Sequence, residues 1–145
     1  MLKIMKKHMV LLVCWIMIIL MSTCLAGPFP KHLNGDSDII QMHQNTYIRK
    51  SSVNVIKYAP PEYTISIEVL VGDFDGNVTS KYTSKFFYEY DNKNMYYRNA
   101  GEWVYIQPKS FEAVNTEMRS IGEMAFYLAY GIRFFNCLDD EVYRR

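Results

Sequence analysis

A change of hydrophobic period near residue 108 restricts the fold of this chain more than any other feature of its sequence. Before that point, five short segments alternate apolar and polar residues, and turn-forming residues separate them. Consecutive short strands joined by turns predict an antiparallel β meander of about five strands. These segments are residues 53–58, 63–69, 81–90, 95–98 and 103–106.

Residues after 108 follow a helical period instead. Phe111, Val114 and Met118 have the spacing of a short first helix. Ser120 and Glu123 match a capping box, which predicts the start of a second helix. Strands followed by helices predict an α+β domain, with one or two C-terminal helices packed on one sheet face. The predicted core stripe of the second helix is Ile121, Met124, Ala125, Leu128, Ile132 and Phe135.

The first 26 residues have the order of a secretory signal peptide. Three lysines precede an apolar run from Met9 to Leu20, which is shorter than the about 20 residues that span a bilayer. Small residues then lead to Gly27, so we expect cleavage after Ala26 and export to a bacterial periplasm, the cell surface or the medium. Two alternatives remain open, an uncleaved anchor and lipidation of Cys24, and only these would attach the protein to a membrane.

Cleavage would leave 119 of the 145 residues, enough for one domain with a modest core. Residues 27–45 have little apolar periodicity and are expected to form a flexible tail. Residues 46–137 are expected to form the single α+β domain, and residues 138–145 a charged C-terminal tail.

The charge balance argues against nucleic-acid binding. The chain has 16 basic and 15 acidic residues, and loss of the three leader lysines gives a net charge of −2. A nucleic-acid partner would require a concentrated basic face.

Cys137 is the single cysteine that cleavage would leave, so it has no intrachain partner for a disulfide. It is expected either to be buried, the favoured interpretation, or to join two chains. A nucleophile–base pair with His32 or His43 is disfavoured, because both histidines lie in the predicted tail and no cysteine-enzyme signature surrounds Cys137.

Two groups of acidic residues are considered as a metal site and as a catalytic site, and neither is favoured. Asp73, Asp75 and Asn77 begin like a calcium loop but lack the glycine and glutamate that complete it, so an acidic hairpin turn is favoured. Glu68 and Glu89 could meet across strands as paired carboxylates, although a solvated face is the simpler interpretation. We therefore predict no catalytic residue, no metal and no cofactor.

The segment from 122 to 131 is apolar on almost all sides if it is helical. Phe126, Tyr130 and Phe134 form a second row beside the predicted core stripe. Since a small domain can rarely bury a helix on two sides, this row is a candidate surface for a partner or for a homodimer. Ordinary core packing is the alternative.

Three motifs resemble those of small exported bacterial proteins of unknown role. They are YIxxSSV at 47–53, WxYIxP at 103–108 and GEMAFYLAYG at 122–131. The first motif, placed before a run of strands, is also distantly similar to the surface-adhesin protein E family. That resemblance implies a compact antiparallel sheet packed with helix and binding to host surface components. The chain has Arg49 where that family usually has aspartate and lacks its cysteine pair, so no functional residue is carried over.

The sequence thus favours a non-enzymatic exported binding module whose partner is a protein or a surface component. A small hydrolase that uses cross-strand carboxylates and a secreted enzyme inhibitor are the alternatives.

Overall fold

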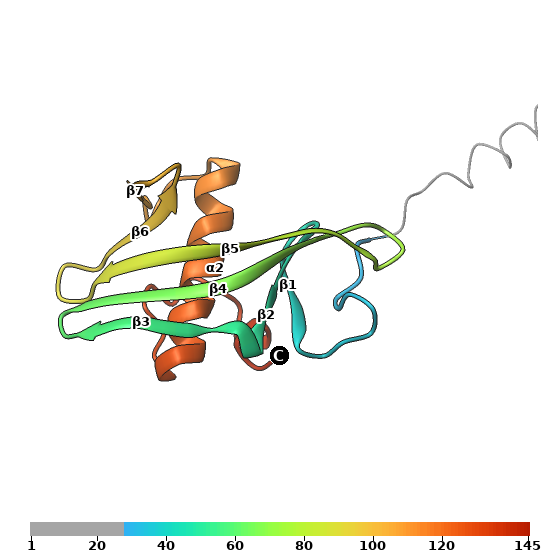
Figure 1. Ribbon diagram of the computed structural model, residues 1–145, viewed down its shortest axis with the longest axis horizontal. Helices are drawn as coiled ribbons and strands as arrows, with labels where there is room; N and C mark the ends of the chain where they lie inside the picture. Colours follow the sequence, from blue (N-terminus) through green and yellow to red (C-terminus); the bar gives the residue numbers. More distant parts are fainter. Residues whose placement is uncertain (1–27) are drawn as a thin grey trace, which may run out of the picture.

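The computed structural model describes residues 28–145, which form a seven-stranded antiparallel sheet with one long helix across one face (Figure 1). The α+β prediction is confirmed. The predicted signal peptide, with Cys24, lies outside the described residues. The strands are β1 (Ile39–His43), β2 (Thr46–Arg49), β3 (Asn54–Ala59), β4 (Glu62–Gly72), β5 (Val78–Glu89), β6 (Asn94–Asn99) and β7 (Glu102–Tyr105). The helices are the 3₁₀ turn η1 (Lys50–Ser52), α2 (Ala113–Tyr130) and α3 (Asp140–Tyr143).

The five predicted strands correspond to β3 through β7, and two further strands precede them. The sheet order is β1-β2-β4-β5-β6-β7. Strand β4 is long enough to pair with two strands along the same edge: Thr46 of β2 lies opposite Val71, and Ala59 of β3 lies opposite Glu62. The turn η1 joins β2 to β3 along this edge (Figure 1).

Residues 27–45 were expected to be a flexible tail, and the structure corrects this expectation. The segment contains β1, and Leu33 and Ile39 are buried. They form a second, smaller core with Tyr47 and Leu70 on the sheet face opposite the helix. Its apolar residues are too few to give a period, yet Leu33, Ile39 and Ile40 are buried and Phe29 and Met42 are half-buried. A side chain at Gly72 would overlap Leu33, so the close approach of this segment requires glycine there.

Helix α2 is one continuous helix of 18 residues rather than two. The predicted capping box at Ser120 is wrong, because Ser120 lies inside the helix and its hydroxyl donates to the carbonyl of Thr116 at 2.9 Å. The helix ends at Gly131, which adopts a left-handed φ of 69°. Ile132 follows that end and is 44% exposed, so it does not belong to the core stripe.

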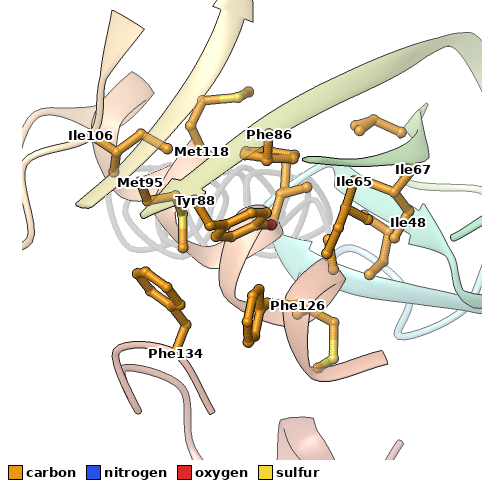
Figure 2. Close-up of a cluster of buried hydrophobic side chains, with 14 of the residues drawn as sticks. Ile48, Ile65, Ile67, Phe86, Tyr88, Met95, Ile106, Met118, Phe126 and Phe134 are labelled. Carbon is orange, nitrogen blue, oxygen red and sulfur yellow. The ribbon is translucent and has the colours of Figure 1, made fainter. Parts of the chain in front are cut away.

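The main core lies between α2 and the covered sheet face (Figure 2). Ile65, Ile67 and Val69 alternate along β4 toward this face, as the sequence pattern predicts. Helix residues pack onto them and onto the neighbouring strand β5. The buried residues from β5 and α2 include Phe86, Tyr88, Ile121, Met124, Ala125 and Phe126.

The C-terminal residues 138–145 do not form the free charged tail that was expected. They contain α3, and Tyr143 is only 5% exposed. The hydroxyl of Tyr143 donates to Oε1 of Glu123 at 2.7 Å, and the backbone N–H groups of Phe135 and Asn136 donate to the same carboxylate at 2.6 and 3.1 Å. The fully buried Glu123 therefore fixes the chain end onto the domain. Within residues 28–145, no helix is both long and apolar enough to cross a membrane.

Candidate functional site

The predicted partner-binding row on the helix lies mainly inside the protein. Phe126 is 1% exposed and Phe134 is 3% exposed, and their ring centroids are 5.1 Å apart (Figure 2). Gly131 ends the helix and the chain turns back, which brings Phe134 over Phe126 and Tyr88. The expectation of a surface row assumed that the helix continued through Phe134, and the structure corrects it.

Tyr130 is the one member of this row that is only partly buried. Its ring packs against Tyr63 at 5.2 Å and against Phe126 at 4.9 Å. Its hydroxyl oxygen is buried and has no hydrogen-bond partner within the described chain. Tyr130 therefore belongs to the margin of the core and presents little surface to a partner.

The opposite sheet face carries a different group of aromatic residues, which we name the aromatic platform: Phe87, Tyr96, Trp103 and Tyr105. Strand register places them on one face, because Phe87 pairs with Tyr96 and Tyr96 pairs with Tyr105. Neighbouring ring centroids lie 5.4–5.8 Å apart. Trp103 is 39% exposed and Tyr105 is 43% exposed, so the platform faces solvent.

Polar side chains border the platform and contact two of its rings, Trp103 and Tyr96. The guanidinium of Arg98 lies 5.1 Å from the centre of the Trp103 ring, within cation–π range. At the other end, Oε2 of Glu89 accepts hydrogen bonds from the Tyr96 hydroxyl at 3.0 Å and from Nδ2 of Asn94 at 3.1 Å. Desolvation and the bond to Glu89 both raise the pKa of Tyr96, so its hydroxyl stays protonated as a donor.

A cavity of about 510 Å³ adjoins the platform at Tyr105. Its lining is mostly apolar, and Phe111 on its wall is 96% exposed. The Phe111 ring therefore makes almost no contact within the described chain and is accessible to a ligand. The lining residues are Tyr105, Gln107, Pro108, Lys109, Ser110 and Phe111.

The first turns of α2 hold the loop that forms this cavity. Nη1 of Arg119 donates to the backbone carbonyls of Gln107, Pro108 and Ser110 at 3.2, 2.7 and 3.1 Å. The Asn115 side chain bonds both the N–H and the carbonyl of Gln107. The cavity wall is therefore tied to the rigid helix, which reduces the entropy that a ligand must remove on binding.

Sequence reasoning did not identify the platform. The alternation in residues 81–90 placed Phe87 with two lysines, a threonine and one glutamate, on the polar side of its strand. The aromatic residue Phe87 on this otherwise polar side was the one signal in the sequence that pointed to the platform. Trp103 and Tyr105 share a short strand with the same alternation, but their side of the sheet depends on pairing with β6.

The two carboxylates considered as a possible pair, Glu68 and Glu89, do not come together. Glu68 lies opposite Thr83, whereas Glu89 lies opposite Glu62, so six residues separate them along the sheet. That spacing corresponds to about 20 Å. Glu68 instead accepts a hydrogen bond from Nε of Arg49 at 2.8 Å.

The acidic turn between β4 and β5 is confirmed as a turn. Oδ1 of Asp73 accepts the backbone N–H of Asn77 at 2.8 Å, and Gly76 takes a φ of 85°. Among residues 28–145, no cluster of three or more histidine, cysteine, aspartate or glutamate side chains could hold a metal ion.

Cys137 is exposed, contrary to the favoured expectation that it is buried. Local desolvation at the sulfur, followed by the nearby charge of Glu123, nevertheless raises the pKa of its thiol to about 11. Of the two histidines considered as its base, His32 is already engaged: Nδ1 lies 2.8 Å from the carbonyl oxygen of Ile39. A thiol in this state is a poor nucleophile at neutral pH.

Alkylation of Cys137 by iodoacetamide should therefore be more than about tenfold slower at pH 7.5 than alkylation of free cysteine. A raised pKa means that the neutral thiol persists to higher pH, so the rate should rise with pH until about 11. Peptide mass spectrometry over a pH series measures the rate at Cys137 alone. A plateau reached below pH 8 would show a thiolate that the structure does not support.

In comparisons with family models, with curated proteins and with solved structures, nothing matches this chain.

Proposed function

We propose that the protein is a non-enzymatic exported binding module and that it binds its partner through the aromatic platform. The single observation that carries this proposal is the exposure of Trp103 and Tyr105 on a sheet face that the helix leaves open. The order of residues 1–26 supports export.

The composition of the platform is that of a binding surface. Tryptophan, tyrosine and arginine are the residues most enriched at energetic hot spots of interfaces, because they combine a large rigid apolar surface with a polar group. Here Trp103, Tyr105 and Arg98 lie together, and ring packing fixes their positions. Little conformational entropy is then lost when a partner covers them.

The acidic residues near the platform support binding over catalysis. Glu62 lies opposite Glu89, but it pairs with Nζ of Lys57 at 2.6 Å. The Glu89 carboxylate accepts bonds from Tyr96 and Asn94. Both carboxylates therefore already bind side chains of the protein, whereas a catalytic pair must converge on a substrate.

Replacing Trp103 with alanine should weaken ligand binding by about 30-fold, since a hot-spot tryptophan contributes about 2 kcal/mol or more. A printed glycan array and a displayed random-peptide library, each screened with wild type and variant, supply the ligands. Calorimetry with the ligand that gives the highest signal then measures its affinity for the wild type and for the variant.

Tyr58→Ala is the matched control, because Tyr58 is 67% exposed and packs with Tyr63 and Tyr130 on the helix side of the sheet. Its affinity should stay within about twofold of wild type, as expected for a residue outside the interface. Ligands bound equally well by Trp103→Ala and wild type would refute the proposal.

A further inference from the structure

We infer that the aromatic platform and the adjoining cavity bind a neutral oligosaccharide. This inference rests on the proposed function and specifies its ligand. It is drawn from the exposed aromatic rings of the surface, its mixed charge and an unused hydrogen-bond acceptor at its border.

The exposed rings suit the faces of sugar rings. A pyranose presents a face of C–H groups, which packs against the electron-rich face of an aromatic ring. Trp103 and Tyr105 are partly exposed, and Phe111 on the cavity wall is almost fully exposed, so each ring has surface that a sugar can cover. The platform and the cavity share Tyr105, so a ligand that covers both must contain more than one ring.

The cavity is open to solvent, so a ligand bound there would stay partly exposed. The cavity volume of about 510 Å³ lies within the range of about 300–1,000 Å³ that is usual for small-ligand sites. Its lining combines apolar rings with the polar side chains of Gln107, Lys109 and Ser110. That combination matches a sugar, which has apolar faces and a hydroxyl-bearing edge.

The border of the platform contains acceptors as well as donors. Both hydrogen bonds to Glu89 end on Oε2, and within residues 28–145 its Oε1 receives none. A sugar hydroxyl can donate to this oxygen, and other hydroxyls can accept from Asn94 or Lys109. A charge-assisted bond of this kind is stronger than one between neutral groups.

The same acceptor disfavours a proline-rich peptide, another ligand of aromatic grooves. Proline has no backbone N–H, and a proline-rich segment therefore presents mostly carbonyl acceptors. Covering Glu89 with such a segment would remove water from its carboxylate without supplying a donor, which is unfavourable.

The charges around the surface favour a neutral ligand. Arg98 lies beside Trp103 and Lys109 lines the cavity, whereas Glu89 borders the opposite end of the platform. Lys85, which is exposed two residues from Phe87 on the same face of β5, adds a further cation. Both signs are therefore present, and the surface does not carry charge of a single sign that would select an ion of the opposite sign.

The test uses the purified protein on an array that carries neutral oligosaccharides of glucose, xylose, mannose and N-acetylglucosamine, together with sialylated and uronic-acid glycans and a proline decamer. The highest signal should come from a neutral oligosaccharide. In calorimetry with that soluble oligosaccharide, Trp103→Ala should bind at least tenfold more weakly and Glu89→Ala at least fivefold more weakly. Glu89→Gln retains an acceptor oxygen and should lose less, and Tyr58→Ala should bind as wild type does.

Three results would overturn the inference: preference for acidic glycans, binding of the proline decamer alone, or no glycan binding. If Trp103→Ala abolishes binding of the decamer or of a displayed peptide, the proposed function stands and only the ligand class is wrong. If every ligand from the array and the library binds Trp103→Ala as well as wild type, both the proposed function and the ligand class are wrong. Circular dichroism of each variant shows whether a loss of binding reflects unfolding, and an unfolded Glu89→Ala leaves the decision to Trp103→Ala and Glu89→Gln.

Discussion

Replacing Phe126 with alanine should lower the free energy of unfolding by about 3–5 kcal/mol, as the loss of a buried phenylalanine usually does. The Phe126 ring packs against five other aromatic rings, with centroid distances of 4.8–5.9 Å. Truncation would leave a cavity at the centre of this cluster, which the surrounding rigid rings can close only in part. The neighbouring rings are those of Tyr63, Tyr88, Tyr90, Tyr130 and Phe134.

Urea unfolding followed by circular dichroism measures this loss, which is large beside a total stability of about 5–15 kcal/mol. Tyr130→Phe is the matched control. It removes only a buried hydroxyl without a partner, so stability should not fall. A loss below about 1 kcal/mol for Phe126→Ala would mean that the ring is not in the core, and would restore the row of Phe126, Tyr130 and Phe134 as a candidate surface.

Replacing Glu123 with alanine should lower the free energy of unfolding by about 3 kcal/mol. The change leaves two backbone N–H groups, of Phe135 and Asn136, and the Tyr143 hydroxyl without their acceptor. Each buried donor that loses its partner costs about 1–3 kcal/mol, reduced where water can enter. The C-terminal segment should detach before the sheet unfolds.

Hydrogen exchange of the Phe135 and Asn136 amides measures this detachment, and urea unfolding measures the total loss. Glu102→Ala provides the control, because Glu102 is exposed on β7 and its removal should change stability by less than about 0.5 kcal/mol. Unchanged exchange at both amides in Glu123→Ala would show that Glu123 does not hold this segment.

The sequence was sufficient to predict the strands in which apolar and polar residues alternate over many positions. Residues 63–69 and 81–90 alternate over enough positions for their strands to be recognised, and turn residues separate them. Strands β1 and β2 were missed because each is only four or five residues long and the first has a single apolar pair, Ile39–Ile40. Ile39 of β1 and Tyr47 of β2 are buried only because Leu33 and Leu70, which belong to other segments, pack against them.

The sequence prediction put the candidate binding surface on the helix for a related reason. A helical row through Phe126, Tyr130 and Phe134 assumes that the helix continues, whereas it ends at Gly131 and Phe134 folds back into the core. The platform brings together residues of β5, β6 and β7, and only the pairing of these strands puts Phe87 beside Trp103. Pairing of this kind is a tertiary property that no single segment encodes.

Hydroxyl-radical footprinting tests most directly whether the open sheet face, rather than the helix, is the binding surface. The protein is oxidised with and without the neutral oligosaccharide that gives the highest array signal, and peptide mass spectrometry quantifies each side chain. Without the ligand, Trp103, Tyr105 and Phe111 should be oxidised rapidly, whereas Phe126 and Phe134 should be protected. The ligand should protect the first three and leave Tyr58 unchanged. Protection at Tyr58, with Trp103 and Tyr105 unaffected, would contradict the account.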